Sequence, residues 1–214
     1  MPLLLLDLDN TLVDRDAAFR SAMAEFLAGH GLPAEDLAWI MAVDDDGYAA
    51  RPAVASALSH RYGTQVPPDA VRDVLDRGAA DRVTLAAPVR TALVEAAGAG
   101  WTPVVVTNGR TAQQTRKIRR TGLDALVDGW AISEAVGHAK PSPEIFRAAA
   151  AGRPLRQAWM VGDAARTDIA GARALGLRSV WLARGRTWQE REYAPTHIAG
   201  DVVAALEHVI GQER

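Results

Sequence analysis

The stretch LLLLDLDNT, residues 3–11, decides how this chain folds. Its four leucines have no polar face, and a short continuous apolar run bounded by polar residues is typical of a parallel strand that is buried on both sides. The strand is expected to end at Asp7, where the acidic side chains begin. Ligands of open α/β folds bind beyond the carboxyl ends of such strands. The stretch therefore predicts a central strand that carries acids into a ligand site.

From Pro88 onward, helical and extended patterns alternate along the chain. Apolar runs predict the strands of a parallel sheet, and the segments between them predict the connecting helices of βαβ units. The predicted fold class is α/β, with a doubly wound, Rossmann-like parallel sheet. The expected strands are 3–6, 102–106, 130–132, 158–161 and 179–182, and the expected helices are 89–97, 112–121, 143–151, 168–175 and 202–210.

A block without a strand pattern separates the first strand from the rest of the sheet. Its helical patterns are interrupted by glycine, proline and aspartate, which favour turns. Several short helices in succession predict a small helical bundle. We therefore expect a core of residues 1–14 and 87–214, interrupted by a helical insert of residues 15–86. The helices of this insert are expected at 17–30, 34–43, 52–62 and 69–82.

Composition and charge restrict the possible functions. The net charge of −2 over 214 residues is too near neutrality to indicate a nucleic-acid or membrane-surface partner. The absence of cysteine excludes disulfides, thiolate nucleophiles and Cys-ligated zinc. The apolar opening, Met1–Leu6, is far shorter than a signal-peptide core or a membrane span, so a cytoplasmic location is expected. Lysine chemistry has only two candidates, Lys117 and Lys140.

Polar side chains follow the predicted strands at their carboxyl ends, where they are expected to converge. They are Asp7, Asp9, Thr107, Asn108, Lys140, Asp163 and Asp168. Two carboxylates about 4 Å apart repel by roughly 4 kcal/mol at an effective dielectric constant of ~20. A single lysine offsets too little of the repulsion among four acids, whereas a divalent cation resolves it. Oxygen ligands favour Mg²⁺ over zinc or copper.

These residues and their order resemble the motifs of the haloacid dehalogenase (HAD) superfamily over essentially the whole chain. The family's DxD motif with a following threonine is DLDNT at 7–11, and its strand-ending Ser/Thr is TNG at 107–109. Its lysine before a proline-rich helix start is KPSPE at 140–144, and its GDxxxxD motif is GDAARTD at 162–168. Two departures, Asn10 for the commoner glycine and Ser142 for the commoner aspartate, remove no reacting group.

The resemblance implies a Mg²⁺-dependent phosphatase that works through an aspartyl-phosphate. Asp7 would attack the phosphorus and also ligate the metal. Asp9 would donate a proton to the leaving oxygen and later accept one from the attacking water, and its backbone carbonyl would be a further metal ligand. Dehalogenase members of the family lack this second aspartate, because no leaving oxygen needs a proton. The presence of Asp9 therefore favours phosphate-ester hydrolysis over dehalogenation.

The remaining motif residues would surround the phosphoryl group and the metal. Thr107 and the backbone N–H of Asn108 would hold the transferring phosphoryl group, and Lys140 would neutralise charge beside the nucleophile. Asp163 would bind the metal, and Asp168 would support the metal site without ligating the metal directly. The resemblance thus gives each of these residues an expected role.

The helical insert resembles the family's C1-type cap, which closes over the site and restricts it to small metabolites. The expected partner is a small phosphorylated molecule, without nucleic acid or membrane. Neither the identity of this molecule nor the oligomeric state can be read from the residues. The polar cap residues that are candidates for choosing the substrate are Arg20, Asp44, Asp45, Asp46 and Arg51.

Other functions use similar residues. A phosphotransferase or phosphomutase forms the same aspartyl-phosphate but excludes water. A phosphoacceptor signalling module also combines acids, a Thr/Ser and a lysine on a doubly wound fold, but its acceptor ends a later strand and it has no helical insert. A catalytically silent binding protein would have lost reacting residues, whereas all of them are present. Phosphomonoester hydrolysis is the leading hypothesis.

Overall fold

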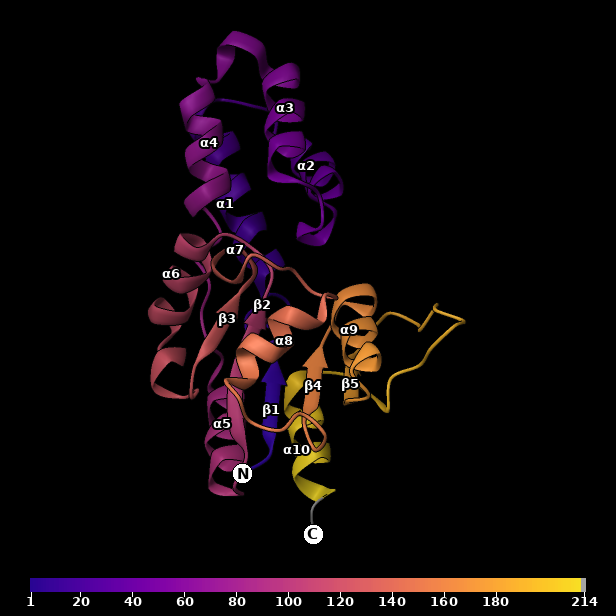
Figure 1. Ribbon diagram of the computed structural model, residues 1–214. Helices are drawn as coiled ribbons and strands as arrows, with labels where there is room; N and C mark the ends of the chain where they lie inside the picture. The colour runs from indigo at the N-terminus through magenta and orange to yellow at the C-terminus, as the bar shows by residue number, and fades with distance from the viewer. Residues whose placement is uncertain (213–214) are drawn as a thin grey trace. The chain divides into compact units, whose positions relative to one another are not determined.

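The computed structural model describes residues 1–212. The chain divides into two compact units, one of Met1–Val13 with Thr84–Arg214 and one of Asp14–Val83. The first unit is an α/β core around one six-stranded sheet, and the regular elements of the second are all helices (Figure 1). Among the described residues, no helix has both the length and the apolar character that a membrane span requires.

The core sheet has the strand order β3-β2-β1-β4-β5-β6, and every neighbouring pair is parallel. The predicted α/β fold class is therefore confirmed. The sixth strand was not predicted, because its three residues contain no apolar run. The strands are β1 (Leu3–Leu6), β2 (Thr102–Thr107), β3 (Trp130–Ile132), β4 (Trp159–Gly162), β5 (Arg178–Leu182) and β6 (His197–Ala199).

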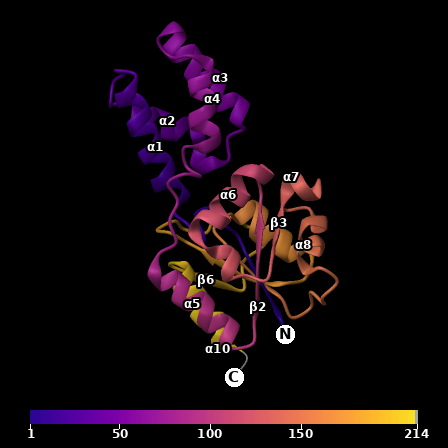
Figure 2. The same cartoon turned by 90° about the vertical axis from the view of Figure 1, so that its left-hand side faces the viewer.

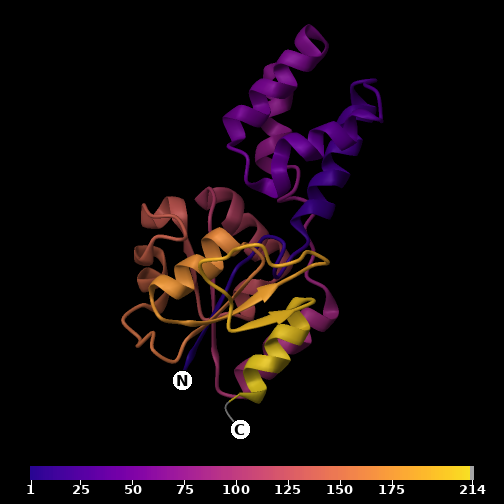
Figure 3. The same cartoon turned by 90° about the vertical axis from the view of Figure 1, so that its right-hand side faces the viewer.

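Strand β1 lies in the middle of the sheet, between β2 and β4, and helices cover both faces of the sheet. Leu3 and Leu5 join one apolar cluster with Ile145 and Phe146 of α8 (Pro143–Ala150). Side chains alternate along a strand, so the intervening leucines point to the other face. Helices α5 (Ala87–Gly98) and α10 (Val202–Gly211) lie side by side and contact the sheet (Figures 2 and 3). The four leucines are completely buried, as an apolar strand between two helical layers requires.

The remaining helices of the core follow strand ends. The helix expected at 168–175 is divided into a π-helical turn and α9, and the turn carries Asp168 into the interior. Helix α9 ends at Ala174, one residue before the predicted helix end. The π-helical turn before it was not predictable from the spacing of apolar residues. The elements are α6 (Thr111–Thr121), a 3₁₀ turn (Leu123–Ala125), α7 (Ser133–Val136), the π-helical turn (Ala165–Ile169) and α9 (Ala170–Ala174).

The helical unit has its own core. The Asp14 side chain accepts a hydrogen bond from the Ala17 N–H (3.0 Å) and so caps the first helix. Phe19 and Met23 of that helix are buried with residues of the other helices of the unit. The elements are α1 (Arg15–Gly29), α2 (Asp36–Asp44), α3 (Arg51–Tyr62) and α4 (Pro68–Arg77), with 3₁₀ turns at Asp45–Gly47 and Gly63–Gln65.

Candidate active site

A tight turn directly after β1 holds the first two acids at the carboxyl edge of the sheet. The Asp7 N–H donates to the Val161 carbonyl of β4 (3.0 Å), which continues the pairing of β1 with β4. The Leu8 carbonyl then accepts hydrogen bonds from the N–H groups of Leu12 and Val13. Asn10 has a φ of 62°, a left-handed conformation that asparagine adopts more readily than most residues. Asparagine therefore suits this position of the turn.

Lys140 lies between two buried carboxylates. Its Nζ is 2.6 Å from Asp7 Oδ1 and 2.7 Å from Asp168 Oδ1, and its side chain is only 2 % exposed. The Asn108 side chain fixes the lysine backbone, because its Oδ1 accepts from the Lys140 N–H (2.8 Å) and its Nδ2 donates to the Lys140 carbonyl (3.1 Å). Asn108 thus has a positioning role for its side chain as well as the predicted role for its backbone.

Asp7, Asp163 and Asp168 form an acidic cluster, in which one carboxylate oxygen of each lies within 4.8 Å of the others. All three residues are buried. Asp168 accepts from the Ala164 N–H (3.0 Å) and lies against Gly162. A Cβ atom on Gly162 would lie 2.1 Å from Asp168 Oδ2, so the glycine of this motif makes room for the carboxylate.

Arginines that the sequence analysis did not single out contact Asp163. Nη2 of Arg186 donates to the Asp163 carboxylate (3.1 Å) and to its backbone carbonyl (2.8 Å), and Arg184 lies 3.7 Å from the same carboxylate. The indole N–H of Trp181 also donates to the Asp163 carbonyl (2.8 Å). Trp181 belongs to β5, whereas Arg184 and Arg186 lie in the loop after it, so the position of the two arginines just past a strand end was the available signal.

Lys140, Arg184 and Arg186 together do not offset the burial and mutual repulsion of the three acids. Burial raises the pKa of Asp7 to about 8, with the Lys140 ammonium opposing the rise and the charges of Asp168 and Asp163 adding to it. Burial, with the charge of Asp168, likewise raises the pKa of Asp163 to about 6. Burial alone would lower the pKa of Lys140, but the carboxylates of Asp168 and Asp7 raise it above its usual range, so Lys140 remains an ammonium. This oxygen-only, crowded set of donors fits a divalent cation such as Mg²⁺.

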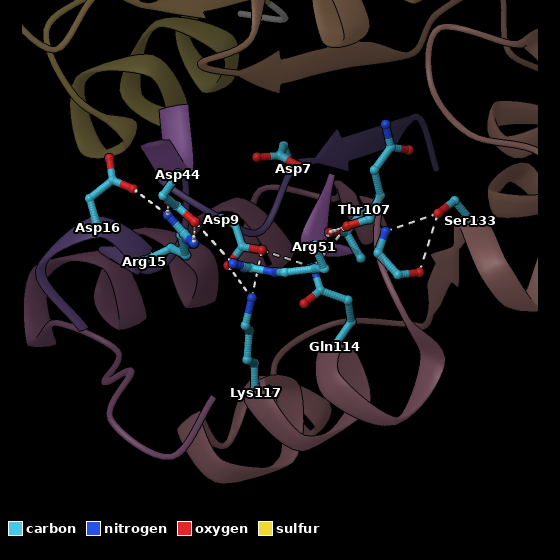
Figure 4. Close-up of polar contacts among 12 residues, drawn as sticks. Asp7, Asp9, Arg15, Asp16, Asp44, Arg51, Thr107, Gln114, Lys117 and Ser133 are labelled. Carbon is cyan, nitrogen blue, oxygen red and sulfur yellow. Dashed lines mark hydrogen bonds and ion pairs between the residues drawn. The ribbon is translucent and has the colours of Figure 1, made fainter. Parts of the chain in front are cut away.

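The side chain of Asp9 contacts two residues of α6, Gln114 and Lys117, to which the sequence assigned no role. Both of its carboxylate oxygens contact Nζ of Lys117, at 2.7 and 2.6 Å, and Oδ2 accepts from Nε2 of Gln114 at 2.9 Å (Figure 4). Asp9 is not among the three acids whose carboxylate oxygens lie within 4.8 Å of one another. A cation from α6 attracts its carboxylate. The second lysine of the chain, which was assigned no role, is that cation.

Thr107 completes the site at the end of β2. Its hydroxyl oxygen accepts from Gln114 Nε2 (2.6 Å), so one amide group joins Thr107 to Asp9. The residue is 1 % exposed. The structure brings all the predicted residues to the carboxyl edge of the core sheet, and their assigned roles stay predictions. These residues are Asp7, Asp9, Thr107, Asn108, Lys140, Asp163 and Asp168.

The polar candidates of the helical unit differ in their exposure. Asp44 is completely buried, and its Oδ1 pairs with Arg15 (2.7 Å) and Arg51 (2.9 Å), as Figure 4 shows. A carboxylate enclosed by two guanidinium groups is placed to stabilise the packing of the unit, and a role of Asp44 in choosing the substrate stays a prediction. The other acids of this segment, Asp45 and Asp46, are exposed, as is Arg20.

Residues 1–176 match the family model of haloacid dehalogenase-like hydrolases. Because the match covers most of the chain and includes all the predicted site residues, from Asp7 to Asp168, this protein belongs to that family. The resemblance stated from the motifs is confirmed.

Named relatives are similar over part of their length. The pyrimidine 5'-nucleotidase YjjG of Escherichia coli is 43 % identical over 95 residues, which are 43 % of this chain and 42 % of that protein. The phosphoserine phosphatase of Thermus thermophilus is 38 % identical over 112 residues, 51 % of this chain and 45 % of that protein. The chain thus matches less than half the length of these relatives.

A solved structure shares the fold over the whole chain. The putative HAD-hydrolase YfnB of Bacillus subtilis, in a magnesium-bound crystal structure, has a TM-score of 0.79 and 22 % identity, with 98 % of both chains covered. At this identity the similarity shows the fold alone.

Proposed function

We propose that this hydrolase releases phosphate from a small phosphomonoester through an aspartyl-phosphate on Asp7, with Mg²⁺ as cofactor. The observation that carries the proposal is the environment of Asp7, a buried carboxylate at the end of β1 with Lys140 at 2.6 Å and two further acids within 4.8 Å. Such a site is suited to ionising a carboxylate nucleophile when a cation binds. The phosphatase activities in the names of the two relatives support the choice of a phosphate ester.

In the first step, Asp7 would attack the phosphorus in line with the leaving oxygen, so that a new P–O bond forms as the ester bond breaks. Asp9, entering this step in its protonated form, would give its proton to the leaving oxygen and become the carboxylate that Lys117 contacts. Lys140, the Thr107 hydroxyl and the Asn108 N–H would stabilise the charge on the transferring oxygens. In the second step, Asp9 would take a proton from water as the water attacks the aspartyl-phosphate, which releases inorganic phosphate and regenerates the Asp7 carboxylate.

Mg²⁺ would be held by the carboxylates of Asp7 and Asp163 and by the backbone carbonyl of Asp9, with Asp168 behind them. When bound, it would supply positive charge to the phosphoryl oxygens and favour the ionised form of Asp7. The residues present fit this role, because the crowded acids are all oxygen donors. The magnesium in the related YfnB structure supports the choice of metal.

We assign the helical unit, Asp14–Val83, the role of a cap that limits the site to small phosphorylated substrates. Its support is the position of the unit in the sequence between the first two motifs, where the family carries its C1-type cap.

The test begins with p-nitrophenyl phosphate and Mg²⁺. We expect release of inorganic phosphate that stops on chelation and resumes when Mg²⁺ is restored. Asp7→Asn should abolish turnover while circular dichroism stays unchanged. Strong activity of this variant would reject Asp7 as the nucleophile. Halide release from a 2-haloacid, measured in parallel, would instead identify a dehalogenase.

The substrate is then sought among phosphorylated metabolites. A panel that includes pyrimidine nucleotides, phosphoserine and glyceraldehyde 3-phosphate would be compared by kcat/KM, with free phosphate as the readout. Transfer of the phosphoryl group to a second metabolite without release of phosphate would identify a phosphotransferase or mutase.

A further inference from the structure

We propose that Lys117 and Gln114 are positioning residues that hold the carboxylate of Asp9 where it exchanges protons with the reacting groups. The inference rests on the proposed role of Asp9 as general acid and base, and it adds two residues to the site. Neither belongs to the motifs that defined the site in the sequence.

The geometry of the contact is specific. Nζ of Lys117 reaches both oxygens of Asp9, at 2.7 and 2.6 Å, and Gln114 Nε2 donates to one of them at 2.9 Å. Gln114 and Lys117 are three residues apart on α6, so their side chains lie on the same face of the helix. Figure 4 shows both side chains directed from α6 toward Asp9. Contacts to both oxygens restrict the rotation of the carboxylate about its side-chain bonds.

The burial of the two partners differs in a way that suits proton exchange. The Lys117 side chain is 2 % exposed, whereas that of Asp9 is 27 % exposed. The cation therefore lies on the protein side of Asp9, whose side chain is partly exposed to solvent. A buried ion pair is weak evidence for stability, because desolvation of both charges opposes their attraction. Orientation of Asp9 is the better explanation for a buried ammonium at this position.

Gln114 connects Asp9 to the phosphoryl-binding loop. Its Nε2 donates not only to Asp9 but also to the Thr107 hydroxyl (2.6 Å) and the Asn108 carbonyl (3.1 Å). Its Oε1 is buried, and within residues 1–212 it has no hydrogen-bond partner. The amide group is thus oriented so that its Nε2 reaches these three acceptors, although its Oε1 then makes no hydrogen bond within the described residues. A side chain that only filled space would not require this orientation.

Gly109 makes the approach of Gln114 possible. Its φ is 139°, and a Cβ atom there would come within 3.2 Å of the Gln114 side chain. The loop TNG at 107–109 therefore accommodates both the phosphoryl-binding threonine and the amide that reaches Asp9. One short segment, 107–117, sets the relative positions of the two groups that would act on the phosphate ester.

The kinetic test compares leaving groups. Lys117→Met and Gln114→Met should lower kcat/KM for an alkyl phosphate by about 30- to 100-fold, because an alkoxide leaves only with a proton, and general acids contribute roughly 10²–10⁴-fold. For p-nitrophenyl phosphate, whose leaving group needs no proton, we expect a loss of less than about 5-fold on the same grounds. Asp9→Asn should show the same pattern with larger losses. Arg120→Met, which removes an exposed cation from the same helix, is the matched control and should behave as the wild type.

Lys117→Arg should recover part of the loss, since it restores a cation but not the compact ammonium geometry. Equal losses for alkyl and aryl phosphates in Lys117→Met and Gln114→Met would overturn the proposal, because they would indicate a general defect of the site. A wild-type protein without any phosphatase activity would instead refute the proposed function.

A stability cycle tests the contact without using activity. Asp9→Asn leaves the buried ammonium without its carboxylate and should lower the melting temperature by roughly 6–20 °C. Adding Lys117→Met to Asp9→Asn should restore most of this loss. Additive effects of the two substitutions would show that Lys117 does not hold Asp9, whatever the enzyme hydrolyses.

Discussion

Replacement of Asp44 by alanine tests whether this residue stabilises the helical unit or contacts the substrate. Asp44 is completely buried, and the Arg15 side chain with which it pairs is 2 % exposed. Breaking a buried ion pair from one side costs about 3–5 kcal/mol, because the remaining charge stays desolvated. Arg15 would keep its contact to Asp16 (3.1 Å) and its position 4.4 Å from the Phe19 ring centre. We therefore expect the lower end, about 3 kcal/mol.

Hydrogen exchange with mass spectrometry measures this loss locally. A destabilisation of about 3 kcal/mol corresponds to roughly a 150-fold increase in the opening of peptides from residues 14–83, at 1.4 kcal/mol per factor of ten. Peptides from the core are the internal control and should exchange as in the wild type if the two units open independently. Asp45→Asn changes an exposed neighbour whose left-handed φ of 50° suits asparagine, and should have little effect.

Two arginine variants sharpen the comparison. Arg15→Met should destabilise the unit more than Arg51→Met, because the 21 % exposed Arg51 is partly solvated and stabilises the buried Asp44 carboxylate less than the 2 % exposed Arg15 does. If Asp44→Ala instead raised KM while exchange in the helical unit stayed unchanged, Asp44 would be a substrate contact, and the assignment of a structural role would be wrong.

Three further predictions concern the core. Because burial raises the pKa of Asp7 to about 8, the metal-free folded state keeps a proton that the unfolded chain loses above about pH 4, so its stability falls as pH rises from about 4 to about 8. Mg²⁺ binding displaces that proton, so the rise in melting temperature on adding Mg²⁺ should be larger at pH 8 than at pH 6, and equal rises would contradict the assignment. Gly162→Ala places a Cβ atom 2.1 Å from the buried carboxylate beneath it and should reduce kcat at least about 100-fold, whereas Gly98→Ala, which has open space, should leave kcat unchanged. Asn108→Ala removes both hydrogen bonds to the Lys140 backbone and should lower kcat about 10- to 100-fold, and an unchanged kcat would show that Lys140 is positioned without it.

The sequence by itself determined the fold class and the edge of the sheet at which the chemistry lies. Four leucines without a polar face indicate a strand buried on both sides, and alternating strands and helices imply a parallel sheet. The carboxyl ends of parallel strands meet at one edge, so residues after β1, β2 and β4 were expected to be neighbours. These signals are local in the sequence. They are sufficient because the topology of a parallel sheet brings the carboxyl ends of its strands to one edge.

Tertiary structure alone decided which partner each charged group has. Lys117 contacts Asp9 across 108 positions of sequence, and Arg186 contacts Asp163 across 23. Asp44 resembled its exposed neighbours Asp45 and Asp46 in the sequence, yet the packing of α1 against α2 encloses it beside Arg15. No periodicity or spacing encodes such pairs, because the energy of a charge depends on burial and on the charges around it. Both are known only once distant segments have packed together.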